Sequence, residues 1–523
     1  MAIAKKEKIM KSKKEKMPKV YPNDTKTLIG FSTVSWLQGF ATVVFSLFMQ
    51  YLTDYSGIDE AVGQVGYAAA FGTAILLLTR IVDAVDDPVQ AWIMDSAKEN
   101  RFGKYRSFTL VSVFLIAAGI VMMFTLPEAV RSSKAHLWIW VVIGYLLFEM
   151  GSAFNGIYAI IQKATTDAGL RTKIMSLLRM AIILSVIPAS FFIPIATAAN
   201  AWFHDMGRSF TVCMSVITLF SMAISLLGVA LIREPYYGAG GDQIQNEEES
   251  KLHLRDVAFM LRSNRPLWAH NIAYFFCNAS YPICTAILVY FLKWYYCADL
   301  ATGVVDNAQY AAIYGLYGAI SLIPAFLTPL IAAPFIRLFK TIDKAQRACL
   351  VMILIGYGLL FGLYITGILK ISPMIFLVVM FFIAIPSNIS TIPAQLLGTE
   401  VADYAEYTTG KNMTAMTTAV QNVLQKADTA IAAVIPGLIL IAVGYSVNSQ
   451  TGNYAGDLIQ LPGMVSRLAM VFTLVPALAT FIGWAVYKWG YNITPQFRQQ
   501  MTAELDRRHS KSAGKETEDA GRE

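Results

Sequence analysis

LIGFSTVSWLQGFATVVFSLFMQY, residues 28–51, is the stretch of the sequence that decides the fold. It carries no charged side chain, and a helix of about 20 apolar residues is long enough to cross a bilayer. Comparable apolar runs follow along the whole chain. The runs begin near Leu28, Gly63, Ser107, Leu137, Ile174, Ser209, Trp268, Ala308, Ala348, Pro373, Met413 and Met464. Their lengths predict an all-α membrane protein with about twelve spans.

The composition supports this class. Of the 523 residues, 56% are hydrophobic and 15% are charged, and the mean hydropathy is +0.50. A soluble protein of this size would carry about a quarter charged residues. The sequence contains no G-x-S-x-G, P-loop or HExxH motif. We therefore expect a membrane protein that is not an enzyme and has no cofactor.

The net charge of +7 is concentrated before the first apolar run. No arginine interleaves with the lysines of this segment, which favours a cytoplasmic tail over an arm that binds nucleic acid. The basic residues concerned are Lys5, Lys6, Lys8, Lys11, Lys13, Lys14, Lys16 and Lys19. The run at residues 28–51 is too long for a signal peptide. Together with an even number of spans, this pattern predicts that both termini lie in the cytoplasm, in an inner-membrane protein.

The longest hydrophilic interruption predicts how the chain is divided. It includes GAGGDQIQNEEE, residues 238–249, and separates the sixth expected span from the seventh. Two six-helix halves joined by a central cytoplasmic loop are the layout of the major facilitator superfamily, with a central cavity at the midplane. The expected divisions are a basic tail at 1–27, an N-terminal half at 28–232, a loop at 233–266, a C-terminal half at 267–490 and a C-terminal tail at 491–523.

The second expected span, YAAAFGTAILLLTRIVDAVDDPVQAWI at residues 67–93, contains several charges. Asp83 and Asp87 lie four residues apart and share one helical face. Two such carboxylates suit a small cation, or one of them can be held protonated by its neighbour, which suits H⁺ coupling. The alternative is a structural ion pair between Arg80 and Asp83. Because intramembrane charges are costly, we favour a coupling site for Na⁺ or H⁺.

Other polar residues fall inside the expected spans. Lys426 lies deep in the eleventh, where an ammonium group has little access to water, although amides and hydroxyls nearby could also join helices together. In the fourth, Ser152 and Asn155 are spaced to share a face, and Tyr158 follows about one turn later. Arg179, near the start of the fifth, could face the cavity or a lipid headgroup.

Two motifs carry a resemblance to a known family. The first is RIVDAVDDPVQAWIMDSAKENRFGKYRSF, residues 80–108, and the second is EVADYAEYTTGKN, residues 400–412, followed by AVQNVLQKADTAIAAVIPG. Both resemble signatures of the glycoside–pentoside–hexuronide:cation symporters, the melibiose-carrier branch of the major facilitator superfamily. The resemblance spans both expected halves and implies transport of a sugar together with a cation.

The resemblance also implies roles for individual residues. A cation would be bound by Asp83, Asp87, Ser152 and Asn155. Substrate would be bound by Gln38, Asn155, Tyr158, Arg179, Gln421 and Lys426. Coupling or gating would involve Arg80, Lys426, Asp403, Tyr404 and Glu406.

This chain departs from the family pattern at two carboxylates. Gln38, or Leu37 in a shifted register, stands where the first helix carries an aspartate, and Asn155 or Phe154 replaces the acid of the fourth helix. The loss favours an anionic sugar or a larger glycoside over a simple galactoside. The alternative is that Glu149 or another acid restores a site for a neutral sugar. The expected partners are thus a sugar or glycoside, a cation and membrane lipids, with no nucleic acid, and the protein would work as a monomer. A lipid or lysolipid carrier of the same fold is the alternative.

Overall fold

The computed structural model describes residues 24–98, 102–164, 168–234, 262, 264–410, 414–442, 444–505 and 507. Within these ranges the regular secondary structure is helical. Two isolated antiparallel bridges join Ala298 to Val305 and Val447 to Tyr454. At some helical positions only the backbone is described, and these include residues 80–92 and position 426.

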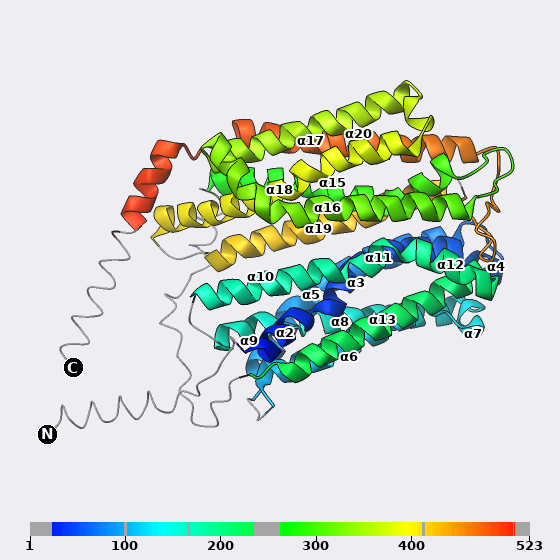
Figure 1. The fold of residues 1–523 in the computed structure, drawn as a ribbon, viewed down its shortest axis with the longest axis horizontal. Helices are drawn as coiled ribbons and strands as arrows, with labels where there is room; N and C mark the ends of the chain where they lie inside the picture. The colour runs from blue at the N-terminus through cyan, green and yellow to red at the C-terminus, as the bar shows by residue number, and fades with distance from the viewer. Residues whose placement is uncertain are drawn as a thin grey trace. The chain divides into compact units, whose positions relative to one another are not determined.

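Figure 1 shows the helices, coloured in the order of the chain. In chain order they are α2 (Thr25–Thr33), α3 (Trp36–Gln50), the π-helix η1 (Tyr51–Tyr55), α4 (Ile58–Val62), α5 (Tyr67–Ser96), α6 (Lys104–Met123), α7 (Glu128–Arg131), α8 (Lys134–Ala153), α9 (Ile157–Ala164), α10 (Ala168–Ser185), α11 (Ile187–Ser190), α12 (Phe192–Phe203), α13 (Met206–Leu231), α15 (Arg265–Tyr296), α16 (Asn307–Phe339), α17 (Ile342–Ile365), the 3-10 helix η2 (Ile368–Lys370), α18 (Pro373–Thr409), α19 (Thr414–Ala442) and α20 (Leu461–Trp489).

Among the described residues, 10 helical segments are long and apolar enough to cross a membrane. They are Thr25–Val44, Lys104–Met123, Lys134–Ile161, Lys173–Ser190, Met206–Leu231, Arg265–Tyr296, Asn307–Thr328, Ile342–Ile365, Pro373–Thr409 and Leu461–Trp489. Two further long helices, α5 and α19, lie where the spans beginning near Gly63 and Met413 were expected. The prediction of a multi-span, all-α membrane protein is therefore confirmed.

Local sequence signals set the helix ends. The Asp306 side chain accepts hydrogen bonds from the backbone N–H groups of Ala308 and Gln309, both at 3.0 Å, and so caps the start of α16. At the C-terminal end of α18, Gly410 has a φ of 71°. Glycine adopts this left-handed conformation without steric strain. These devices satisfy backbone groups that a helix leaves without intrahelical partners.

The chain forms two compact units. Unit 1 comprises the described residues within Met1–Phe45, Val85–Phe192 and Phe210–Ile244. Unit 2 comprises those within Ser46–Ala84, Ile193–Ser209 and Gln245–Glu523. The two units are groups of residues that contact one another in this structure. The halves predicted at 28–232 and 267–490 are instead continuous stretches of the chain. Those halves remain a prediction.

In unit 1, α6 and α8 pack closely because glycines face the neighbouring backbone. A Cβ atom on Gly119 would lie 2.6 Å from the backbone nitrogen of Phe148, and one on Gly151 would lie 2.7 Å from that of Ile116. The Ser112 hydroxyl donates to the carbonyl of Gly151 across the same contact. Small residues of this kind let membrane helices approach closely, where dispersion rather than water exclusion holds them together.

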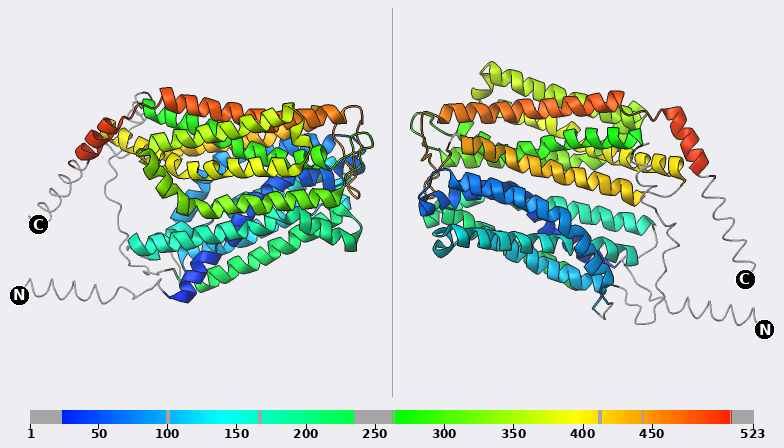
Figure 2. Two further views of the ribbon diagram at one scale, coloured as in Figure 1. Left: turned by 45° about the horizontal axis from the view of Figure 1, so that its top comes forward. Right: turned by 180° about the vertical axis from the view of Figure 1, so that it is seen from behind.

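In unit 2, α15 packs against α18, α19 and α20, and α17 packs against α18 and α20. The views in Figures 1 and 2 agree that the long helices of this unit run alongside one another. Phe291 of α15 stacks on Phe472 of α20, with ring centroids 4.9 Å apart. Unit 2 is therefore organised around α15, which supplies polar side chains to both of its sites described below.

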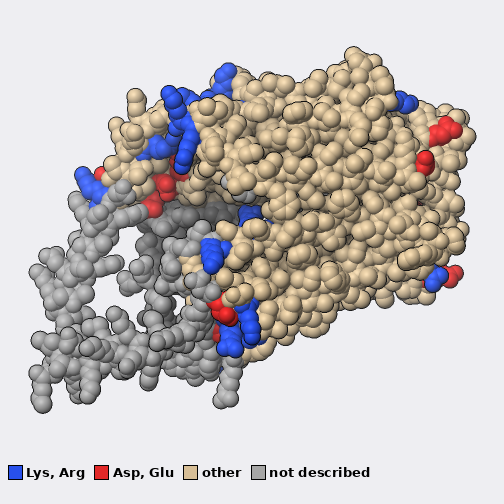
Figure 3. Space-filling view, in the orientation of Figure 1, with Lys and Arg blue, Asp and Glu red and all other residues tan. Residues whose placement is uncertain are grey.

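The surface has the apolar character that lipid contact requires. On α13, Val216, Leu219, Phe220 and Leu227 are all more than half exposed. On the face seen in Figure 3, wide stretches carry neither basic nor acidic side chains. Exposed apolar surface of this extent is rare on soluble monomers and is expected for helices that face hydrocarbon.

We predict that Gly119→Val lowers the thermal stability of the purified protein in detergent. The new side chain would meet the backbone of α8, and overpacking of this kind costs about 1–3 kcal/mol. The matched control is Gly358→Val in α17, where a Cβ atom would have no neighbour within 4 Å. Equal melting temperatures for the two variants would contradict the close α6–α8 packing.

Candidate functional site

The predicted cation site lies on α5. Asp83 and Asp87 are four residues apart on this continuous helix, as the sequence indicated. Their side chains and that of Arg80 lie outside the described residues. The cation-binding role of the two aspartates and the coupling role of Arg80 therefore stay predictions.

Two predicted substrate residues of unit 1 contact one another. The amide nitrogen of Asn155 donates a hydrogen bond to Oε1 of Gln38, near the start of α3. The Asn155 Oδ1 atom accepts from the backbone N–H of Ile157 at 3.2 Å, which fixes the orientation of the amide. The structure thus brings together two amides that, in one of the two registers allowed by the resemblance, stand where the family carries carboxylates.

A break between helices places Asn155. The helix α8 ends at Ala153, so Asn155 does not continue the helical face of Ser152 as its spacing suggested. Gly156 permits the break, because a Cβ atom there would lie 2.8 Å from Cβ of Tyr105. The backbone N–H of Gly156 donates to the Thr109 hydroxyl at 3.2 Å. The close approach to α6 therefore turns the Asn155 amide towards α3.

The other predicted residues of unit 1 are dispersed. Ser152 is half-buried on α8. The Tyr158 side chain on α9 is 54% exposed, and Arg179 is exposed on α10. No described hydrogen bond joins any of these three to the Gln38–Asn155 pair, so their proposed roles remain predictions.

The predicted gating residues lie at the end of α18. Asp403 is exposed there, and Glu406 is half-buried. The Tyr404 ring contacts Phe497, with ring centroids 5.9 Å apart. One turn earlier on α18 lies a carboxylate that the sequence did not single out.

Glu400 is this carboxylate, and it is 6% exposed. It accepts hydrogen bonds from the Tyr491 hydroxyl at 2.9 Å and from Nη2 of Arg498 at 2.9 Å. The hydrogen bond from Arg498 to the Glu400 carboxylate raises the pKa of Arg498. The contacts tie the end of α18 to the helical segment at residues 495–505.

In unit 2, Gln421 lies on α19, five residues before Lys426. The Lys426 side chain lies outside the described residues, and its substrate and coupling roles stay predictions. Gln421 is half-buried and lines a pocket between α15, α18 and α19 with a cavity of about 130 Å³. Its polar lining is uncharged and consists of His270, Asn271, Gln395, Thr399, Thr417 and Gln421.

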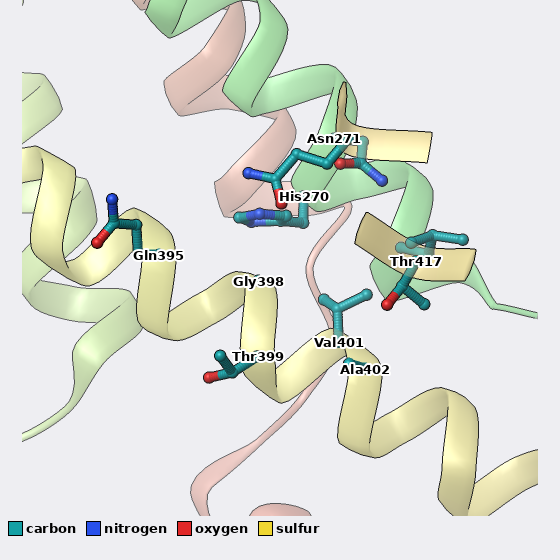
Figure 4. A pocket seen from close by; sticks show the side chains of 10 residues that line it. His270, Asn271, Gln395, Gly398, Thr399, Val401, Ala402 and Thr417 are labelled. Atoms are coloured by element: carbon teal, nitrogen blue, oxygen red, sulfur yellow. The ribbon is translucent and has the colours of Figure 1, made fainter. Parts of the chain in front are cut away.

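Figure 4 shows His270 and Asn271 on α15 projecting towards this pocket, with Gly398 of α18 beside the imidazole ring. The Nδ1 atom of His270 is hydrogen-bonded to the Tyr487 hydroxyl at 3.0 Å. Its Nε2 atom has no hydrogen-bond partner in the described part of the chain. The same holds for both polar atoms of the Asn271 amide.

Polar pairs continue along the contact between α15 and α19. The Gln425 amide donates to the Tyr274 hydroxyl at 3.0 Å, and the Asn278 amide donates to Oδ2 of Asp428 at 2.7 Å. These pairs follow Asn271 at intervals of about one turn, as the helical repeat requires. The eleventh expected span therefore presents a polar stripe to α15, of which the sequence analysis had singled out Gln421.

A fully buried ion pair is a second feature of unit 2. The Lys293 ammonium of α15 lies 2.6 Å from Oδ2 of Asp54 in the π-helix η1, and both side chains are fully buried. The other oxygen of Asp54 accepts from the hydroxyls of Tyr445 at 2.9 Å and Thr53 at 2.8 Å. The indole N–H of Trp294 donates to Tyr445 in turn. π-Helical turns often occur at functional sites.

The sequence carried part of this signal. Lys293 interrupts the apolar run AILVYFLKWYY, residues 286–296, and an ionisable residue inside a span is a functional candidate. Its partner could not be identified, because Asp54 lies 239 residues away in a segment that the sequence places between spans. The pair joins one segment from each of the two predicted halves.

Comparison with known proteins now decides the family. Residues 30–495 match the family described as MFS/sugar transport protein. The chain belongs to this family. The match covers both predicted halves and confirms the resemblance that the motifs at residues 80–108 and 400–412 carry. Membership in this family makes the protein a transporter and not an enzyme.

Individual relatives agree with the family. The chain is 23% identical over 453 residues to an uncharacterized symporter of Bacillus subtilis, YnaJ, covering 85% of this chain and 88% of that protein. It is 22% identical over 494 residues to a glucuronide carrier protein homolog of Escherichia coli. That alignment covers 92% of this chain and 96% of the carrier homolog.

A solved structure supports the fold alone. A bacterial homolog of the human lysosomal transporter Spinster, in an inward-facing and unoccupied conformation, gives a TM-score of 0.56 with 12% identity. The alignment covers 90% of this chain and 98% of that one. The all-α major facilitator fold predicted from the sequence is therefore confirmed.

We predict that Lys293→Met destabilises the sugar-transport protein strongly. It would leave the buried Asp54 carboxylate without its cation, and breaking a buried pair costs about 3–5 kcal/mol. The double variant Asp54→Asn with Lys293→Met removes both charges and should recover part of that loss. Thermal unfolding in detergent measures both effects, with exposed Lys370→Met as the control. A double variant less stable than the single one would contradict the assignment of the loss to an unpaired charge.

Proposed function

We propose that the protein carries a sugar or glycoside into the cell together with Na⁺ or H⁺, by alternating access. The observation that carries this proposal is the family match over residues 30–495, to which α5 adds two carboxylates one turn apart. The similarity to a symporter supports the coupling. The protein would lie in the cell membrane as a monomer surrounded by lipid, with both termini in the cytoplasm.

The cation would bind at Asp83 and Asp87. Carboxylate oxygens are hard ligands that suit Na⁺, and two adjacent carboxylates can also share one proton. Ser152 and Asn155 would complete the ligand set. In support, Asn155 lies in the short break between α8 and α9, and broken helices supply ion ligands in other transporters.

The substrate would contact Gln38, Asn155, Tyr158, Arg179, Gln421 and Lys426. The hydrogen bond between Gln38 and Asn155 supports the grouping of the first two. Both are neutral, whereas Arg179 and Lys426 are cationic. A site with two cationic side chains and no acidic one favours a sugar that bears a carboxylate. Arginine binds such a carboxylate in a bidentate manner. The similarity to a glucuronide carrier homolog supports an anionic sugar.

In the transport cycle, the bound cation would organise the sugar site and raise its affinity. The bound sugar must then raise the affinity for the cation by the same factor. Arg80 and Lys426 would couple the two sites, and Asp403, Tyr404 and Glu406 would contribute to the inner gate. Rocking of the two halves would release both solutes inside. A lipid carrier is disfavoured, because Gln425 and Asp428 of α19 form polar contacts with α15 rather than an apolar face.

We predict that Asp83→Cys or Asp87→Cys abolishes concentrative sugar uptake by proteoliposomes while the protein still expresses. Loss of either carboxylate removes a ligand of the coupling ion. The matched control is Asp95→Cys, because this residue lies on the same helix about two turns beyond Asp87. Full cation-driven accumulation by either test variant would remove these aspartates from the coupling role.

We predict that Arg179→Gln selectively weakens the binding of anionic sugars. Charge-assisted hydrogen bonds contribute about 1.5–3 kcal/mol, so affinity for a glucuronide should fall by about tenfold or more. Affinity for a neutral glycoside such as melibiose should change little. Competition binding on the purified protein measures both. If melibiose competes as well as any uronide and the variant leaves all affinities unchanged, the substrate is not selected by its charge.

A further inference from the structure

We propose that the pocket between α15, α18 and α19 is a subsite for the hydroxyl groups of a sugar ring, centred on His270 and Asn271. This inference rests on the proposed sugar transport and adds residues that the family motifs do not include. It concerns a part of unit 2 that is separate from the Gln38–Asn155 pair of unit 1.

The first support is unsatisfied hydrogen-bonding capacity at buried positions. His270 is 1% exposed and Asn271 is 2% exposed. The Nε2 atom of the imidazole and both polar atoms of the amide lack a partner among the described residues. Burial of a polar group without a hydrogen-bond partner is unfavourable. A ligand hydroxyl that forms hydrogen bonds with these atoms would therefore bind more favourably.

The second support is the orientation of the imidazole. The hydrogen bond from Nδ1 to the Tyr487 hydroxyl, at 3.0 Å, holds the ring from one side. Tyr487 is itself buried, at 4% exposure. The ring is therefore fixed before any ligand arrives, and Nε2 lies on its opposite side. Tyr487 acts as a positioning residue for the subsite.

The third support is space that a glycine keeps open. A Cβ atom on Gly398 would lie 3.3 Å from Nε2 of His270 and 3.5 Å from Oε1 of Gln421. A side chain at this position would therefore crowd both polar atoms. One water needs about 10–15 Å³ of such volume, whereas the cavity measures about 130 Å³. It therefore has room for a group much larger than one water.

The chemistry of the lining selects the class of ligand. The described lining contains no charged side chain, so it does not select a carboxylate or an ammonium group. Amide and imidazole groups together donate and accept hydrogen bonds, which is what a hydroxyl group needs. Leu267, Val401 and Ala402 add apolar surface for the C–H faces of a ring. A neutral, hydroxyl-rich ring such as a pyranose fits this combination.

The depth of the pocket gives its place in the transport cycle. His270 lies in the second turn of α15, which begins at Arg265, and Gln421 lies in the second turn of α19, which begins at Thr414. The pocket is thus nearer a membrane surface than the midplane where such carriers hold their substrate. The predicted topology makes this the cytoplasmic side. A sugar would occupy the subsite after it leaves the midplane site and before its release.

The test is binding to the purified full-length protein in detergent. The probes are glucose, galactose, xylose, melibiose, lactose and glucuronate, each read by thermal shift and by the NMR signal of labelled His270, one of five histidines. We expect at least one of these sugars to stabilise the protein and to shift the His270 signal. Gly398→Val, which fills the pocket, should weaken that binding by tenfold or more, and His270→Gln should weaken it less. The control is Gly358→Val, where the added side chain meets open space.

The outcomes separate this inference from the proposed function. If sugars stabilise the protein but the His270 signal does not move and Gly398→Val binds them normally, the subsite is wrong and sugar transport stands. If a correctly folded Gly398→Val protein loses sugar binding while His270→Gln binds the sugar with unchanged affinity, the sugar occupies the pocket but does not contact His270. A subsite centred on His270 is then contradicted. If none of the six sugars changes either readout, both the subsite and the transport of such sugars are contradicted.

Discussion

Hydrocarbon offers no hydrogen bonds, and this constraint governs the structure from its backbone to its charged side chains. It requires the spanning segments to be helical, so that backbone groups pair within each helix. It also requires each ionisable side chain at depth to have a partner. Charges buried inside the protein need partners for the same reason: Lys293 and Asp54 lie 2.6 Å apart, and two hydroxyls donate to the carboxylate. The rocking motion proposed for transport must operate around contacts of this strength.

Polar groups in unit 2 fall into two kinds with different consequences. Asp54 is satisfied on both oxygens, so its surroundings stabilise one arrangement of the chain. His270 and Asn271 are equally buried but keep hydrogen-bonding atoms without partners in the described structure. A satisfied network favours rigidity, whereas unsatisfied groups beside a cavity favour ligand binding. This difference separates a structural contact from a candidate binding site within the same helix, α15.

Properties that act over one helix were predictable from the sequence. Apolar run length predicted the spans, and the spacing of Asp83 and Asp87 predicted a shared face on what is a continuous α5. Contacts between distant segments were not predictable. Nothing local indicates that Lys293 pairs with Asp54, or that the helix break at Asn155 turns its amide to Gln38. Such contacts depend on three-dimensional packing, in which a close approach such as that of Gly156 to Tyr105 is decisive.

The central claim is thermodynamic coupling between a cation and a sugar, and reciprocal titration measures it directly. The affinity of the purified protein for its sugar should be determined with and without Na⁺ and at two pH values, and the affinity for the coupling cation with and without the sugar. The account predicts that one cation raises sugar affinity and that the sugar raises the affinity for that cation by the same factor. Sugar affinity independent of both Na⁺ and pH would contradict it.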